Sequence, residues 1–191
     1  MRSRRFSMVL AALLTGAGAL GAVALAPAGD GTAAGGAVAA KPPRPARPDC
    51  TAPEFHQFDF WIGDWSVTSG GAQAGTNLVT VEEDGCVIHE HWKGSRGGTG
   101  QSFTFYSRVT GKWKQLWIDN GGNPAELEGT YKDGVLALAS EVKGADGKVA
   151  LSKLTFFDNK ADRTVRQLWE SSNDEGKTWQ VMFDGLYSRK P

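Results

Sequence analysis

The sequence predicts an all-β fold: a single antiparallel, up-and-down β-barrel of about ten strands, preceded by one short helix or turn. Runs of β-branched and aromatic residues recur about every eight to twelve residues, and Gly-, Asn- and Asp-rich turns separate them. Few segments have the periodicity of a helix. A series of short hairpins forms an antiparallel meander, as a sandwich or as a closed barrel, and closure removes the exposed strand edges.

The chain has 191 residues, and its N-terminal part differs in composition from the rest. Residues 1–28 combine a basic start, an apolar run and a small-residue cleavage site, which is the pattern of a secretory signal peptide. Residues 29–49 are rich in Ala, Gly and Pro and predict a disordered linker. One domain of ordinary size remains, residues 50–191. The predicted location is secreted or extracytoplasmic, without stable membrane insertion after cleavage.

The domain begins with the stretch TAPEFHQFDF, in which Thr51 is a candidate N-cap and Pro53 a candidate early helical residue. Ten segments with strand character follow. An Asp-Gly pair separates the sixth from the seventh and favours a tight hairpin. The predicted strands are residues 61–69, 76–83, 86–94, 101–108, 112–119, 125–131, 135–142, 148–158, 163–172 and 178–189.

The chain has two cysteines, Cys50 and Cys86. Two cysteines in an exported protein predict one disulfide, which would tie the start of the domain to its third strand. Two free buried thiols are the alternative.

The balance of charges excludes one class of partner. The chain has 21 basic and 21 acidic residues; without residues 1–40, which hold three Arg and one Asp, 18 basic and 20 acidic residues remain. A near-neutral domain without a basic cluster predicts no binding to nucleic acid. The expected partner is a small-molecule ligand, no cofactor is predicted, and the oligomeric state is left open.

The strand at residues 112–119 indicates what the interior contains. Alternate residues of a strand share a face, and lysines at 112 and 114 mark one face as outward at its start. The other face carries Trp113, Gln115, Trp117 and Asp119. Tryptophan beside fixed polar groups is the composition of a ligand pocket, whereas a solid core in which the polar groups pair is the alternative.

The segments 86–94, 101–108 and 163–172 repeat this mixture, although their inward face is left open by the pattern. We therefore predict a pocket for a small amphipathic or aromatic molecule, with Glu90 as its polar anchor. The predicted wall consists of Trp92, Tyr106, Trp113, Gln115, Trp117, Gln167 and Trp169.

His89 and His91 are the only metal-like pair. Two histidines at i and i+2 on a strand share a face, with Glu82 or Glu83 as neighbours on the preceding strand. The spacing indicates no third ligand, so no metal site is predicted. The simpler interpretation is two solvent-facing histidines on the outside of the barrel.

The stretch FDFWIGDW at residues 58–65, followed in order by HEHW, WKQLWID, VRQLWE and FDGLY, resembles a family of uncharacterised, often exported bacterial proteins of lipocalin or calycin type. The resemblance covers residues 55–189 and implies a lipocalin-like barrel in which Trp65, in a Gly-x-Trp step, closes one end. Asp59 and Asp64 are then structural. The family carries no established activity.

Calycin-type barrels can host isomerase or cyclase chemistry, so the first alternative to binding is an enzyme of isomerase, cyclase or hydrolase type with Glu90 as general acid or base. No nucleophile–base pair supports it, and whether the protein is an enzyme stays open, with binding favoured. The second alternative is a structural or interaction barrel with a filled core and an apolar outer patch.

The stretch SNDEGKTW at residues 172–179 resembles the Asp-box of sialidase repeats. There it is a hairpin away from the active site. A single copy predicts a turn and no sialidase activity.

Overall fold

The computed structural model describes residues 49–144 and 147–191. The predicted signal peptide, and the predicted linker except its last residue, lie outside the described residues, so export stays a prediction. No helix among the residues described is long and apolar enough to cross a membrane.

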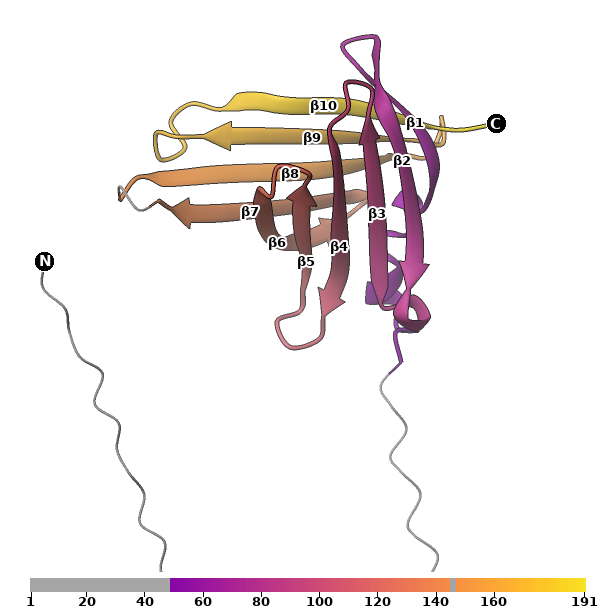
Figure 1. Cartoon of the computed structure of the whole chain (residues 1–191). Helices are drawn as coiled ribbons and strands as arrows, with labels where there is room; N and C mark the ends of the chain where they lie inside the picture. Colours follow the sequence, from indigo (N-terminus) through magenta and orange to yellow (C-terminus); the bar gives the residue numbers. More distant parts are fainter. Residues whose placement is uncertain (1–48, 145–146) are drawn as a thin grey trace, which may run out of the picture. The chain divides into compact units, whose positions relative to one another are not determined.

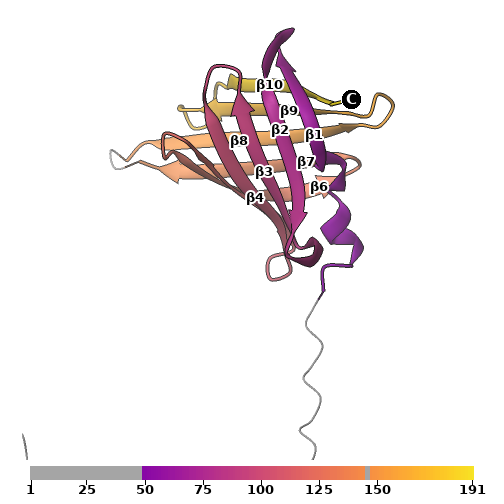
Figure 2. The ribbon, with the colours of Figure 1, turned by 45° about the vertical axis from the view of Figure 1, so that its right-hand side comes forward.

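In the part of the chain that the structure describes, ten antiparallel strands form one closed barrel, as predicted (Figure 1). Each strand pairs with its neighbours in chain order, and β10 closes the sheet by pairing with β1. Strands β7–β10 cross the direction of β2–β5 (Figure 2). The strands are β1 (Gly63–Ser69), β2 (Ala72–Glu82), β3 (Val87–Gly94), β4 (Thr99–Ser107), β5 (Lys112–Asp119), β6 (Pro124–Lys132), β7 (Val135–Lys143), β8 (Val149–Asn159), β9 (Thr164–Ser172) and β10 (Gln180–Arg189).

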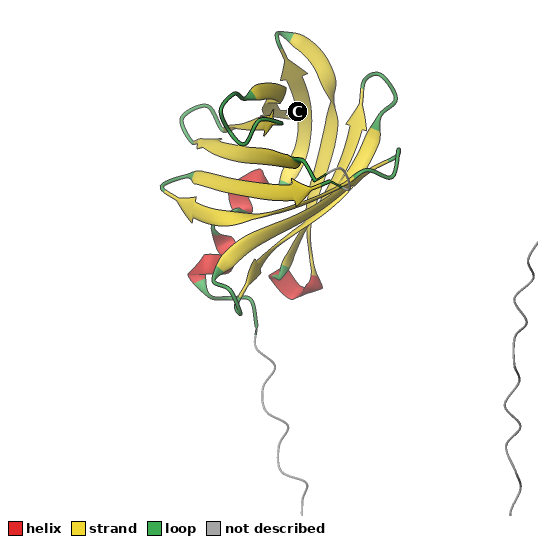
Figure 3. Cartoon of the chain, turned by 90° about the vertical axis from the view of Figure 1, so that its left-hand side faces the viewer, coloured by secondary structure: helices red, strands yellow, loops and turns green. Residues whose placement is uncertain are grey.

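Among the described residues, three short 3-10 segments lie at one end of the barrel (Figure 3): η1 (Pro53–His56), η2 (Asp59–Trp61) and η3 (Glu83–Gly85). We call this the closed end, because the chain between η1 and η2 fills the interior there. Phe58 is fully buried, and its ring stacks on Trp61 with centroids 5.0 Å apart.

The prediction that Thr51 is the N-cap of the first segment is wrong. Ala52 is the N-cap of η1, and no side chain caps it. The Thr51 hydroxyl donates instead to the carboxylate of Asp49, 2.9 Å away.

The stretch FDFWIGDW is a structural opening, and its two aspartates lie outside the core. Asp64 is exposed and pairs with Lys190 at 2.6 Å, and Asp59 pairs with His56 at 2.8 Å. Trp65 is buried, and its indole N–H donates to the carbonyl oxygen of Trp61 at 2.8 Å. This bond joins β1 to the segment that fills the closed end.

Cys50 and Cys86 form a disulfide, with their Cα atoms 5.2 Å apart. Cys86 directly precedes β3, so the bond ties the start of the domain to the closed-end entrance of that strand. The predicted pairing of these cysteines is confirmed.

Residues 172–179 form the predicted turn between β9 and β10. Asp174 accepts a hydrogen bond from the backbone N–H of Thr178 at 2.9 Å, and the Gly176 N–H donates to the Ser172 hydroxyl at 2.9 Å. Gly176 has φ +85°, in the left-handed region that glycine tolerates best.

The alternation of faces follows the pattern read from the sequence. On β3, β4, β5 and β9 the residues grouped with Glu90, Ser102, Gln115 and Gln167 point inward and are buried or partly buried. Their neighbours point out. Exposed apolar side chains result on the outer faces of β2, β4 and β5: Leu78, Phe103, Phe105, Leu116 and Ile118, each at least 36% exposed.

Candidate functional site

A cavity of about 420 Å³ occupies the half of the barrel away from the 3-10 segments. It reaches the rim, where the described strands β3, β5 and β9 end and β8 and β10 begin. We call this the open end. The lining residues are Glu90, Trp92, Gln115, Trp117, Asp119, Ser152, Leu154, Gln167, Trp169, Ser171, Met182, Phe183 and Tyr187.

Five of the seven residues predicted for the pocket wall line this cavity, and so does Glu90, the predicted polar anchor. Tyr106 and Trp113 do not. Both point inward, but they lie at the closed end, where the Trp113 ring meets Phe58 edge-on at 5.8 Å. Tyr106 meets Phe55 in the same way at 5.3 Å. These two rings belong to the core because the residues before β1 pack against them.

Glu90 is the buried ionisable group of the cavity. It comes from the middle of β3 and is 4% exposed. Its two carboxyl oxygens accept hydrogen bonds from the Asn77 amide at 2.8 Å and the Ser102 hydroxyl at 2.7 Å, from the strands on either side. Burial raises the pKa of Glu90 to about 7, although both hydrogen bonds favour the charged form. Glu90 therefore changes charge near neutral pH.

Two further polar pairs face the interior. The Gln115 amide donates to the Thr104 hydroxyl at 2.9 Å, and the Tyr187 hydroxyl donates to the side-chain oxygen of Gln167. Burial, and after it the nearby Glu90 charge, raise the pKa of Tyr187 well above its usual value, so Tyr187 stays protonated. The free N–H groups of Gln115 and Gln167 can meet a bound molecule.

Aromatic rings form much of the remaining wall. Trp92 from β3 and Phe183 from β10 meet edge to face with centroids 5.9 Å apart. Trp117 lies against Gly100 of the neighbouring strand, so closely that a Cβ there would sit 2.3 Å from the ring. The missing side chain lets the ring lie along the wall instead of filling the cavity.

Sequence reasoning missed the contribution of β8 and β10. Met182 and Phe183 are adjacent in sequence, yet both line the cavity. The register between β9 and β10 shifts between Val181 and Phe183, and such a bulge breaks the alternation on which face assignment depends. Ser152, Leu154 and Tyr187 do obey the alternation, but no polar–aromatic run marks their strands.

Asp119, at the end of β5, brings a second carboxylate to the rim. It accepts hydrogen bonds from the backbone N–H of Asn123 at 2.9 Å and of Gly121 at 2.8 Å. The backbone and side chain of Asn123 are the main cause that lowers the pKa of Asp119, so it is an anion at neutral pH.

The histidine pair lies on the outside of β3. The rings of His89 and His91 are 4.0 Å apart, and His89 stacks on Phe103 at 4.3 Å. The nearest carboxylate oxygen, from Glu82, is 4.0 Å from the His89 ring. Within the described residues, no three His, Cys, Asp or Glu side chains are grouped to hold a metal ion.

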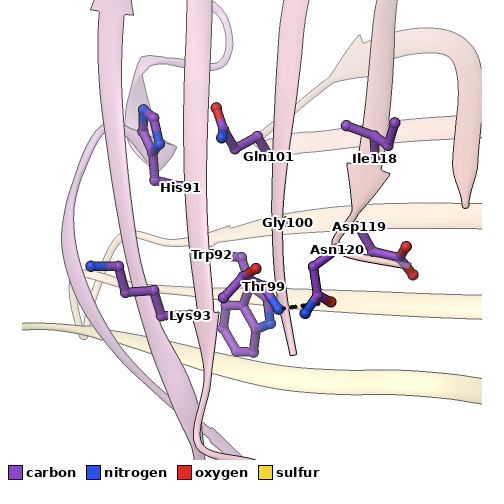
Figure 4. Close-up of a pocket in the computed structure, with 9 residues that line it drawn as sticks. All are labelled: His91, Trp92, Lys93, Thr99, Gly100, Gln101, Ile118, Asp119 and Asn120. Carbon is purple, nitrogen blue, oxygen red and sulfur yellow. Dashed lines mark hydrogen bonds between the residues drawn. The ribbon is translucent and has the colours of Figure 1, made fainter. Parts of the chain in front are cut away.

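A second hollow, of about 440 Å³, lies over the ends of β3, β4 and β5 near the rim (Figure 4). It shares Trp92 and Asp119 with the cavity, but His91, Gln101 and Ile118 come from the outward rows of these strands. None of the described residues that line it has a buried ionisable side chain. The cavity around Glu90 is therefore the better candidate site.

Comparison with models of protein families gives no match, and comparison with curated proteins gives none. The site must therefore be interpreted from its own geometry. That geometry offers an aromatic enclosure, a buried carboxyl group that titrates near neutrality, and amide groups that can donate or accept.

Proposed function

We propose that this protein is an exported, lipocalin-like binding barrel that holds one small amphipathic or aromatic molecule in the cavity around Glu90. The main support for this proposal is that the cavity combines aromatic walls with a few fixed polar groups. Three tryptophans and Phe183 line it toward the rim, and Glu90, Gln115 and Gln167 supply polar atoms deeper inside. Small barrels either fill with side chains or enclose one ligand.

The volume supports binding over the filled-barrel alternative. A cavity of about 420 Å³ lies within the range of small-molecule sites. The closed end, by contrast, is filled by Phe58, Trp61 and Trp113. Exposed apolar side chains, which the filled-barrel alternative predicts on the outside, are also present. Only the interior therefore distinguishes the binding barrel from the filled barrel.

A fluorescence titration tests the proposal. The uncharged probe N-phenyl-1-naphthylamine should bind at a single saturable site, with quenching of tryptophan emission. Replacing Trp117 by Ala should weaken its Kd roughly tenfold, because an aromatic wall of the cavity is lost. The matched control is Leu116→Ala, the adjacent residue, whose side chain is outward and 43% exposed. Equal affinity of the two variants, or no saturable binding at all, would refute the proposal.

An acid–base enzyme is the second candidate, because burial raises the pKa of Glu90 to about 7, the range that proton transfer at neutral pH requires. Glu90→Gln would then abolish turnover and leave binding of the neutral probe nearly unchanged. A variant with full turnover would remove Glu90 from the chemistry.

A further inference from the structure

The charged groups of the cavity are all acidic. Among the described residues, Glu90 and Asp119 line it, and no Lys, Arg or His does. Asp119 is held ionised by the hydrogen bonds of the turn that follows β5. An anionic ligand would meet repulsion without a counter-charge, whereas a cation would meet attraction at the rim and at the floor.

The floor of the cavity offers several hydrogen-bond acceptors. Glu90 accepts one hydrogen bond on each oxygen, which leaves lone pairs on both. Gln115 and Gln167 also line the cavity, and their amide oxygens carry further lone pairs. A ligand with several N–H donors would bind to these oxygens.

The aromatic walls favour the same charge. Trp92, Trp117 and Trp169 line the cavity together with Phe183 and Tyr187. The face of an aromatic ring attracts cations, tryptophan most strongly, and the attraction grows when water is excluded. These residues lie on β3, β5, β9 and β10, so a cation that enters from the rim would meet aromatic side chains from several strands.

We propose that the ligand is a protonated primary amine on an apolar or aromatic body, with its ammonium group bound to the Glu90 carboxylate. The inference rests on the proposed binding function and names its ligand class. Its three N–H donors would meet the Glu90 carboxylate and the amide oxygens of Gln115 and Gln167, and the body would lie between the rings toward the rim.

Binding of an ammonium group requires Glu90 to be ionised. The other titratable groups that face it are Tyr187 from β10, which stays neutral, and Asp119 from β5, which stays charged. The neighbouring strands β2 and β4 contribute the uncharged Asn77 and Ser102. At pH 7 the bound ammonium therefore displaces the proton that part of the free protein carries on Glu90.

The test uses four probes with the same naphthyl group: 2-(1-naphthyl)ethylamine, its N,N,N-trimethylammonium analogue, 2-(1-naphthyl)ethanol and 1-naphthylacetate. Each is titrated by calorimetry at about pH 8, where Glu90 is mostly ionised and the amine is charged. The amine should bind at least about tenfold more tightly than the alcohol, and the carboxylate should bind most weakly. Repetition at pH 7 in buffers of different ionisation enthalpy should show proton release when the amine binds and none when the alcohol binds.

Several outcomes would overturn the inference. If the alcohol binds as tightly as the amine, the cation preference is wrong while the proposed binding function stands. If the trimethylammonium analogue binds as tightly as the amine, the N–H donors contribute nothing to the affinity, and the primary-amine class is wrong. If neither these probes nor N-phenyl-1-naphthylamine bind, the proposed function fails together with the inference.

Two substitutions assign the effect to Glu90. Glu90→Gln should remove the preference for the amine, so that the Kd values for the amine and the alcohol lie within about threefold of each other. Glu126→Gln makes the same charge change on the exposed outer face of β6 and should alter neither. A preference retained in Glu90→Gln would overturn the inference. Proton release in the unmodified protein tests it independently of any variant's folding.

Discussion

Glu90 is the residue at which stability and the candidate function meet. A buried carboxylate costs free energy unless it is paired, and the described neighbours of Glu90 supply two neutral hydrogen bonds and no cation. The protein thus keeps an ionisable group where an apolar residue would be less costly. Such a group is a candidate for function for a stated physical reason.

The raised pKa of Glu90 predicts how stability depends on pH. The pKa is about 7 in the folded protein, against an ordinary value of 4.5 for the unfolded chain, so between these values the folded protein holds a proton that the unfolded chain has lost. The Glu90 contribution favours folding below about pH 4.5 and is lost as the pH rises through 7. The total is about 3 kcal/mol.

Urea unfolding of the parent and of Glu90→Gln between about pH 4.5 and 8 measures this contribution. The free energy of unfolding of the parent relative to the variant should fall by about 3 kcal/mol across that range. The comparison with the variant is needed because burial lowers the pKa of His91. This shift makes stability rise with pH near the ordinary pKa of histidine, which is opposite to the effect of Glu90, and it is present in both proteins. A difference that does not change with pH would contradict the assignment.

At the scale of elements, sequence patterns predicted the strands because alternation and turn residues are local signals. Lys112 and Lys114 marked the outer face of β5, and the structure places its tryptophans inside. The start of β2 was missed, since its first residues, Ala72 to Gly75, have low strand propensity and are held by pairing with β1.

The candidate site was predicted only in part, and the reason is also physical. Alternation tells inside from outside, but it does not tell one end of a barrel from the other. Trp113 and Trp117 share a face of one strand, yet Phe58 fills the space beside the first and the cavity lies beside the second. The difference depends on a long-range contact that no local pattern contains.

The disulfide is an element-scale constraint with a measurable effect. It closes a loop with a sequence separation of 36 residues and holds the segment with η1 and η2 against the entrance of β3. Replacing both cysteines by serine should lower the free energy of unfolding by about 4 kcal/mol on the chain-entropy model. Denaturant unfolding of the double variant, with the reduced parent as control, measures the loss. Equal stability of the parent and the double variant would show that the bond constrains nothing.

On the scale of the whole molecule, the two ends of the barrel differ: one end is packed and the other holds the cavity. The closed end carries a packed cluster that includes Phe58, Trp61 and Phe156, each with no exposed area. The open end carries the cavity, where side chains are less tightly packed and polar groups are kept. We therefore expect stability and binding to respond to different substitutions.

Phe58→Ala and Trp117→Ala test this division. Phe58→Ala removes a ring that contacts Trp61, Trp113 and Phe156 with centroids 4.9 to 5.8 Å apart, and should lower the free energy of unfolding by about 3–5 kcal/mol. Its Kd for N-phenyl-1-naphthylamine should stay within about threefold of the parent, because the folded cavity is unchanged. Trp117→Ala should show the reverse: a weaker Kd with a smaller loss of stability, since its ring borders space that is already open. If Phe58→Ala abolished binding in protein shown to be folded by near-UV circular dichroism, the two ends would be coupled, and the closed end would belong to the site.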